Sequence, residues 1–195
     1  GVELTVLRDV DNPLTGSTGA ARTYGPQKGA TDAEARQLDA ALVRLAAIVG
    51  DEGKRAGDGA AGGLGYGLRV FTGASVRSGI DYVLDVVRFS ERVRRCDLVL
   101  TGEGRLDAQS SRGKVISGVV RRSRAEQAPV IGLVGAVGEG ARQLMEEGLT
   151  AYFSLCDGPL SESTAIAHAA QLLERLAENV IRLRMAPFAD RARPP

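Results

Sequence analysis

The sequence contains no tryptophan and few other aromatic residues, so its hydrophobic core must be built from aliphatic side chains. Aromatic residues make up 4% of the 195 positions, whereas hydrophobic residues together make up 44%. Charged residues account for 25%, which is ordinary for a globular chain. A chain of this length has room for one α/β domain or two small ones.

Histidine and cysteine are also scarce. The single histidine, His168, excludes histidine-rich zinc sites, and its position beside a helical apolar stripe favours a structural role. Cys96 and Cys156 are far apart and form neither a disulfide framework nor a CxxC metal motif. We expect both to be buried free thiols, which fits a protein of the reducing cytoplasm.

Long apolar runs and a strong charge imbalance are absent. No stretch is apolar for about 18 residues, so we expect no membrane partner. The net charge is +1, and the basic residues Arg121, Arg122 and Arg124 near a helix end should complement the helix dipole and face water. Nucleic acid is therefore not expected as a partner.

Residues 1–7 lack the pattern of a signal peptide and already resemble a strand, which suggests a start inside a larger protein.

The C-terminal part alternates between strand-like and helix-like segments. This βαβαβα order predicts a Rossmann-like parallel sheet with flanking helices. We expect the first strand to be buried on both faces and a glycine loop to follow Thr101 at its carboxyl end, where such sheets bind ligands. The predicted elements, in chain order, are 97–101, 113–126, 129–135, 140–147, 151–155 and 161–183.

The N-terminal part follows a different pattern and predicts a second α/β region. Val2 to Leu7 alternates as a strand does, and the capping box Thr31-Asp32-Ala33-Glu34 begins a helix over 32–49. Further helical segments are predicted up to Val70 and over 80–95. We expect residues 1–95 to form one region, 96–186 the Rossmann-like region and 187–195 a frayed tail.

Two polar segments follow the first predicted strand. Asp9 and Asp11 lie two residues apart, so an extended chain would present both carboxylates on one side, beside Asn12, as Mg²⁺ ligands. An ordinary turn is the alternative, because Asp, Asn and Pro are common turn formers. Lys28 lies between Gly25 and Gly29, where the backbone could approach an anion that the ammonium neutralises; an exposed loop lysine is the alternative.

Two glycine-rich segments are further candidates. Residues 57–65 match G-x-G-x-x-G in letters, but no clear strand precedes them, so a nicotinamide cofactor site is disfavoured. Their small residues could bring a helix N-terminus close to an anion or pack two helices tightly.

Residues 101–107 combine glycines with Glu103, Arg105 and Asp107 after a predicted strand, and Lys114 follows. The acids could hold a metal or accept a proton, and the cations could neutralise phosphate oxygens.

Four of these segments, in this order, resemble the type-1 glycerate kinases of bacteria: Asp9 to Leu14, Gly25 to Ala30, Gly59 to Gly65, and Thr101 to Asp107. The resemblance covers about residues 1–185 and implies two α/β domains around a cleft, one inserted into the other. Residues 1–95 would be the later part of the inserted domain, and 96–186 would complete the Rossmann-like domain.

The resemblance implies transfer of the γ-phosphoryl group of ATP to a hydroxyl of D-glycerate, with 2-phosphoglycerate favoured and Mg²⁺ as the metal. For this reaction we expect one set of acids to hold Mg²⁺ or accept the substrate proton and a second set of residues to bind substrate or phosphate, and the sequence does not divide the roles among the acids. The acids are Asp107, Glu103 and Asp11 for catalysis, with Asp9 and Asp11 for the metal. The second set is Asn12, Lys28, Gly62, Gly63, Gly102, Gly104, Arg105 and Lys114.

The sequence also departs from this family. The segments that the family carries in its N-terminal half do not occur, and Asp58 stands where the family usually has a small residue. Asp58 could be tolerated at a surface or could disturb a phosphate contact. A non-catalytic remnant, or a half-subunit that pairs with a separately encoded N-terminal half, is therefore the alternative function. A missing half would expose a sheet edge and apolar surface and so favour pairing or homodimer formation.

Overall fold

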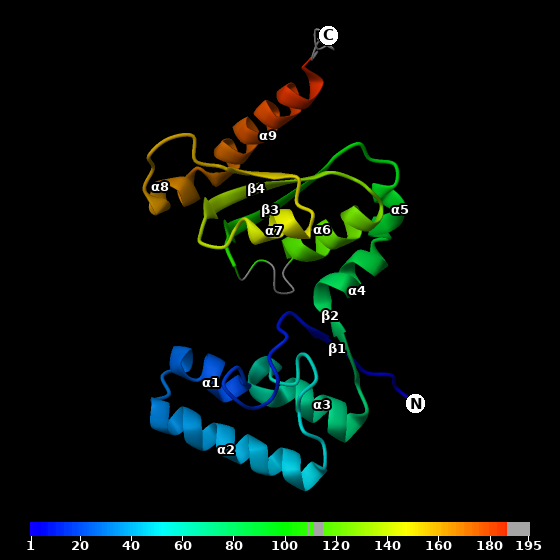
Figure 1. The fold of residues 1–195 in the computed structure, drawn as a ribbon, viewed down its shortest axis with the longest axis vertical. Coiled ribbons are helices and arrows are strands. Elements are labelled where there is room, and N and C mark those ends of the chain that lie inside the picture. Colours follow the sequence, from blue (N-terminus) through cyan, green and yellow to red (C-terminus); the bar gives the residue numbers. More distant parts are fainter. Residues whose placement is uncertain (109, 111–114, 187–195) are drawn as a thin grey trace, which may run out of the picture.

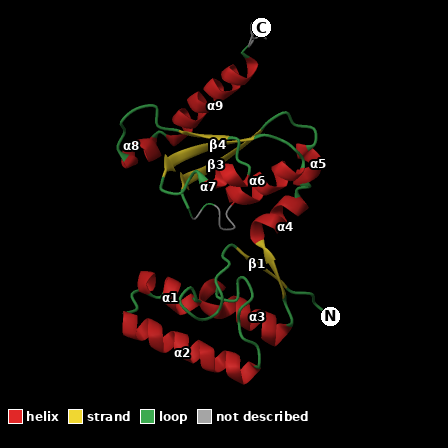
Figure 2. Cartoon of the chain, in the orientation of Figure 1, coloured by secondary structure: helices red, strands yellow, loops and turns green. Residues whose placement is uncertain are grey.

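The computed structural model describes residues 1–108, 110 and 115–186, so Lys114 and the tail 187–195 lie outside the described residues. Within these ranges the chain forms two parallel sheets, shown as arrows in Figures 1 and 2. The first pairs β1 (Thr5–Arg8) with β2 (Ser75–Ser78), and β2 was not predicted from the sequence. The second has the order β3 (Val99–Leu106), β4 (Val130–Val137), β5 (Ala151–Ser154). The α/β class with a parallel C-terminal sheet is confirmed.

The N-terminal part packs its helices around a small core below the first sheet in Figure 1. The predicted helix over 32–49 is confirmed as α2, and both hydrogen bonds of the capping box are present between Thr31 and Glu34. Tyr66 is fully buried beside Leu14, so one aromatic residue does contribute to this core. The helical elements are α1 (Ala20–Tyr24), η1 (Pro26–Lys28), α2 (Asp32–Val49), η2 (Ala60–Gly63) and α3 (Leu64–Thr72).

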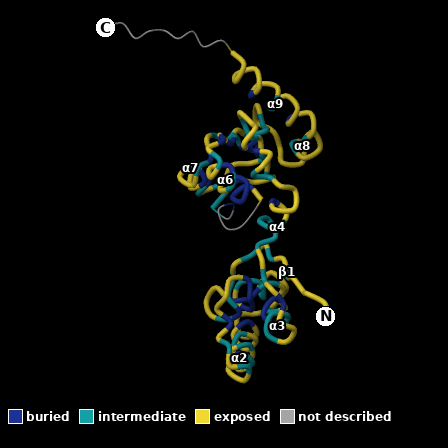
Figure 3. Tube along the Cα trace, turned by 90° about the vertical axis from the view of Figure 1, so that its right-hand side faces the viewer, coloured by how far each residue is buried: buried dark blue, intermediate teal, exposed yellow. Residues whose placement is uncertain are grey.

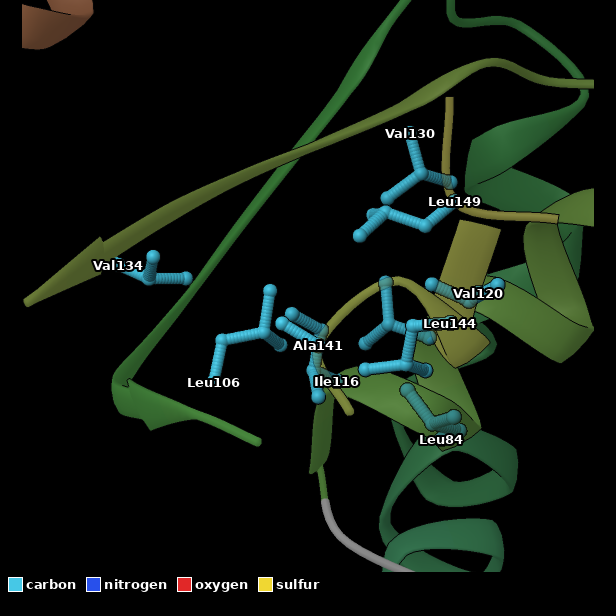
Figure 4. Packing of buried hydrophobic residues seen from close by; sticks show 10 residues of the cluster. Leu84, Leu106, Ile116, Val120, Val130, Val134, Ala141, Leu144 and Leu149 are labelled. Carbon is cyan, nitrogen blue, oxygen red and sulfur yellow. The ribbon is translucent and has the colours of Figure 1, made fainter. Parts of the chain in front are cut away.

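The C-terminal part surrounds its sheet with helices on both faces (Figure 1). Its core is aliphatic, as expected: Leu106, Ile116 and Val134 meet between the sheet and α6, and Leu84 of α4 joins them (Figure 4). Figure 3 shows the buried residues gathered in two groups, one in each part. The helices are α4 (Gly79–Val86), α5 (Phe89–Val93), α6 (Val115–Ala125), α7 (Gln143–Glu147), α8 (Glu162–Ala167) and α9 (Ala169–Met185).

Several details of the sequence prediction are wrong. The expected glycine loop after Thr101 is strand, because β3 continues to Leu106 and pairs with β4 along its length. This strand is not buried on both faces, since Leu100 is 39% exposed. The last predicted helix is divided at His168 into α8 and α9. Cys96 is a free cysteine, as expected, but it is exposed.

Helix α4 is held against α6 by a close contact and by ion pairs. A side chain added at Gly118 of α6 would place its Cβ 2.5 Å from Cγ1 of Ile80, so only glycine allows this approach. Arg121 and Arg122 of α6 bind Asp81 of α4 at 2.5 and 3.4 Å. These two arginines therefore join two helices, in addition to lying near the end of their own helix.

In the described ranges, no helix combines the length and apolar character that crossing a bilayer requires.

The contact at Gly118 predicts that an alanine there destabilises the fold. We expect Gly118→Ala to lower the free energy of unfolding by about 1–3 kcal/mol through overpacking, despite the higher helix propensity of alanine. Gly67→Ala in α3 is the matched control, because its new Cβ would lie 3.9 Å from Phe71. That variant should gain about 0.5–1 kcal/mol. Urea denaturation measures both, and equal effects of the two substitutions would contradict the proposed contact.

Candidate functional site

The loop after β1 carries three of the predicted site residues. Asp9 is exposed at its start, whereas the Asp11 carboxylate forms an ion pair with Arg8. Asn12 donates a hydrogen bond from Nδ2 to the carbonyl oxygen of Thr18 at 2.8 Å and accepts one from the Tyr24 hydroxyl at 2.7 Å. The Asn12 side chain therefore holds the loop in shape through contacts with its own chain.

Tyr24 is a candidate residue that the sequence analysis did not select. Burial raises the pKa of its hydroxyl, and the nearby Asp9 carboxylate raises that pKa further. The hydroxyl therefore stays protonated near neutral pH and can donate to Asn12. The signal that could have selected Tyr24 was its position beside the glycines and Lys28 in the sequence. This signal is weak, because a tyrosine in a predicted loop has many common roles.

The glycine-rich turn before α3 has an unusual backbone. Ala61, Gly62 and Gly63 have φ angles of 50°, 73° and 102°, all in the left-handed region. Gly57 also has a positive φ, and an added side chain there would meet the Arg8 side chain. The glycines at 57, 62 and 63 allow this backbone conformation. The turn can therefore pack against the end of β1, next to Asp9. Since α2, η2 and α3 surround the turn and no strand directly precedes it, the arrangement differs from that of a dinucleotide-binding turn.

A buried group of charges supports this turn. Arg69 of α3 binds Asp58 through two nitrogen atoms and Asp51 through two more contacts, all at 2.8 Å. Asp58 is only 1% exposed and also accepts a hydrogen bond from the Arg55 backbone N–H at 3.0 Å. Asp58 therefore does not lie at a surface. It is also not free to disturb a phosphate contact, because Arg69 compensates its charge.

The hydrogen bonds from Arg69 also affect Asp51. They hold the pKa of the Asp51 carboxyl far below its ordinary value, with a smaller contribution from the Gly53 backbone N–H. The same contacts raise the pKa of Arg69, so both partners stay charged at neutral pH.

The turn, the loop after β1 and η1 together line a pocket of about 580 Å³. Three predicted site residues, Asp9, Lys28 and Gly62, lie on its wall. Tyr24 and the apolar side chain of Leu42 line it as well. The pocket thus combines one ammonium, one carboxylate and one phenol with an otherwise mainly apolar wall, which is typical of small-molecule sites.

The second group of predicted residues lies along the carboxyl half of β3. Arg105 and Asp107 form an ion pair with 3.4 Å between Nε and Oδ2, and the Arg105 side chain is 66% exposed. Glu103 is half-buried on the strand, opposite Val134 of β4. Gly102 lies against β4, because an added Cβ would be 3.0 Å from the Leu133 carbonyl oxygen, whereas Gly104 faces open space.

The segment after β4 is another feature that the sequence analysis missed. Gly138 donates its backbone N–H to the Leu106 carbonyl oxygen at 2.7 Å, and a Cβ added at Gly138 would lie 3.0 Å from Cβ of Asp107 and 3.2 Å from the Arg105 side chain. Ser110 is fully buried, and its hydroxyl accepts a hydrogen bond from the Asp107 N–H at 3.2 Å. One signal for these contacts was available in the sequence. The carboxyl ends of neighbouring parallel strands meet at one edge of a sheet, so the residues that follow β3 and β4 lie close together.

The two groups of residues do not share the 580 Å³ pocket, since all its lining residues fall within 9–62. Among the described residues, no three His, Cys, Asp or Glu side chains gather closely enough to hold a metal ion. The described residues therefore fit Mg²⁺ in one way. The ion would be bound mainly by phosphate oxygens of the substrate, and the protein would add one or two carboxylates.

The fold and this arrangement define an α/β protein whose polar residues gather where parallel strands end, as in enzymes that bind small molecules. The Glycerate kinase family matches residues 1–185, and the chain belongs to that family. Glycerate kinase from Halalkalibacterium halodurans is 44% identical over 92% of this chain. Glycerate 2-kinase from Escherichia coli K12 is 40% identical over 78% of it.

A crystal structure described as glycerate kinase 2 from Salmonella typhimurium LT2 has the same fold. It superimposes with a TM-score of 0.67 and 38% identity over 91% of this chain. This chain covers 47% of that structure and 48% of the Halalkalibacterium protein. It therefore spans about half the length of the relatives that it matches.

The buried charges predict a large loss of stability when Arg69 is removed. We expect Arg69→Met to lower the free energy of unfolding by about 3 kcal/mol or more, because Asp58 is left as a buried charge without its counterion. Arg22→Met is the matched control: Arg22 and Asp39 form a partly exposed pair at 3.9 Å. That pair is worth at most about 1 kcal/mol. Urea denaturation of both variants tests this, and a cost for Arg69→Met no larger than for the control would refute it.

The lowered pKa of Asp51 predicts a dependence of stability on pH. A carboxyl whose pKa is lower in the folded state stabilises the fold above its unfolded value of about 3.9 and loses this effect as pH falls toward the folded value. We expect the free energy of unfolding to fall less between pH 5 and 2 in Asp51→Asn than in the unsubstituted chain. Chemical denaturation across this pH range measures the difference, and parallel pH curves would exclude the assigned role.

Proposed function

We propose that this chain acts as an ATP-dependent glycerate kinase. The reaction would move the γ-phosphoryl group of ATP to a hydroxyl of D-glycerate, with 2-phosphoglycerate as the favoured product. The observation that carries the proposal is the pocket in which Lys28, Asp9 and the left-handed turn at Gly62 come together in a member of the Glycerate kinase family. The name of the Escherichia coli relative supports phosphorylation at the 2-position.

The proposed chemistry requires mainly positioning and neutralisation of charge. The glycerate hydroxyl oxygen forms a bond to the γ-phosphorus, the bond to the bridging oxygen of ADP breaks, and a carboxylate accepts the hydroxyl proton. Lys28 would neutralise phosphate oxygens or the glycerate carboxylate, with the backbone at Gly62 and Gly63 close to the same anion. When bound with ATP, Mg²⁺ would neutralise phosphate charge, and Asp9 is the exposed carboxylate available to it.

The residues at the end of β3 would act on the same reaction from the C-terminal part. We assign Asp107 and Glu103 as candidate proton acceptors and Arg105 as a phosphate ligand, with Gly102 and Gly104 keeping the strand open to the substrate. Lys114 remains a candidate phosphate ligand from the sequence resemblance alone. Asp11 and Asn12 are better explained as supports of the loop, because Arg8 pairs with one Asp11 oxygen and the Asn12 amide binds Thr18 and Tyr24.

A half-subunit that pairs with a separately encoded N-terminal half is the second candidate function. In that case catalysis requires the remaining half of the glycerate kinase fold, and this chain alone binds substrates weakly. The free cysteines and the use of ATP fit the cytoplasm as the site of action.

A kinase assay with ATP, Mg²⁺ and D-glycerate tests both candidates. The chain is assayed alone and after coexpression with the unmatched portion of the Halalkalibacterium enzyme, and phosphoglycerate is identified by NMR. Product from the chain alone supports a complete kinase, and product only from the combination supports the half-subunit. No product from either preparation would contradict both.

In whichever preparation is active, Lys28→Met should lower kcat/KM by about 10²-fold, because one cation is lost from the transferring phosphate. Asp107→Asn should lower kcat by a similar factor of about 10² if Asp107 accepts the proton. Lys54→Met is the control, since Lys54 is 76% exposed and pairs with Glu52 outside the pocket. Near-normal turnover of Lys28→Met or Asp107→Asn would remove that residue from the proposed site.

A further inference from the structure

The side chain of Asn12 ties the loop after β1 to helix α1. Its nitrogen Nδ2 donates hydrogen bonds to the Thr18 carbonyl oxygen at 2.8 Å and to the Thr23 hydroxyl at 3.4 Å. Its oxygen Oδ1 accepts a hydrogen bond from the Tyr24 hydroxyl at 2.7 Å. Since α1 is followed by η1, which ends at Lys28, the half-buried amide of Asn12 holds the segment that carries this lysine.

The backbone of Asn12 ties the same loop to the glycine-rich turn. The Gly59 N–H donates a hydrogen bond to the Asn12 carbonyl oxygen at 2.9 Å. A Cβ added at Gly59 would collide with the Pro13 carbonyl oxygen and lie 3.0 Å from that of Asn12, so the close approach of the two segments requires glycine. Gly62 follows in this turn, and the turn also contacts α1.

Asn12 is therefore the residue at which three pocket-lining segments meet. Asp9 lies in the loop of Asn12 itself, Lys28 lies in η1, and Gly62 lies in the turn. The described lining of the pocket includes these three residues but not Asn12. The contacts of Asn12 thus act on the pocket through the segments that they join.

We infer that Asn12 is a positioning residue that fixes Asp9, Lys28 and the backbone at Gly62 relative to one another. This inference rests on the proposed function, in which these three groups act on one anion and its metal. Catalysis depends steeply on such geometry, because a displacement of about 1 Å can lower a rate by about 10²-fold. Residues that hold the binding groups by packing and hydrogen bonds supply this precision.

The kinetic constants separate positioning from binding. In whichever preparation of the kinase assay is active, Asn12→Ala should lower kcat by about 10²-fold, because the groups that act on the transferring phosphate lose their alignment. KM for ATP and for D-glycerate should change by less than about threefold, since Lys28 and Asp9 are still present to bind. A rise in KM of about tenfold or more with kcat unchanged would make Asn12 a substrate ligand and overturn the inference.

Two control variants separate this effect from a general loss of stability. Asn179→Ala makes the same substitution at an exposed position of α9 and should leave kcat and KM unchanged. Gly118→Ala destabilises the C-terminal core, away from the pocket, and should also leave kcat unchanged at a temperature where every variant is folded. A loss of kcat in Gly118→Ala as large as that in Asn12→Ala would overturn the inference.

Hydrogen exchange followed by NMR on the chain alone tests the contacts without any kinase activity. Asn12→Ala should raise the exchange rates of the Gly59 and Lys28 amides by at least about tenfold, because neither segment is then held by the loop. The rate at Val120, which is fully buried in the C-terminal core, should change by less than about twofold. Unchanged exchange at either Gly59 or Lys28 overturns the inference.

Asn12→Asp is the second variant if Asn12→Ala does not fold. Aspartate has nearly the same shape and still accepts from the Tyr24 hydroxyl, but its carboxylate cannot donate to Thr18. This variant should raise exchange at the same two amides and lower kcat by at least about tenfold, and unchanged values of both overturn the inference. Lack of kinase activity in every unsubstituted preparation contradicts the proposed function instead, and the exchange rates then decide alone whether Asn12 joins the three segments.

Discussion

The proposed pocket depends on the buried contacts between Arg69 and the two carboxylates of Asp58 and Asp51. These contacts fix α3 to the turn at 57–63, and the turn in turn lies against Arg8 at the end of β1. Buried charges are costly unless they are paired, so the arrangement is held in one geometry. The left-handed backbone at Ala61 to Gly63 is an energetically unfavourable conformation for alanine, and such local strain persists only where the surroundings define it.

The two parts of the chain contribute different elements to the proposed chemistry. The N-terminal part offers a preformed pocket with one cation and one carboxylate, whereas the end of β3 offers an exposed Arg105 paired with Asp107. Helix α4 connects them: Ser78 at the end of β2 caps α4, and Leu84 of α4 packs in the C-terminal core.

The sequence by itself determined the α/β class, the parallel order of the C-terminal strands, the α2 helix and the family resemblance, because these follow from local periodicity, capping residues and short motifs. Only the tertiary structure decided that 101–106 is strand, since the pairing with β4, which continues to Leu106 and Val137, defines it and no local signal does. It also decided that Asp58 is buried and compensated, because Arg69 and Asp51 come from separate segments. Contacts between distant residues, such as those of Asn12 with Thr18 and Tyr24, cannot be read from spacing, and they determine which polar atoms remain available to a substrate.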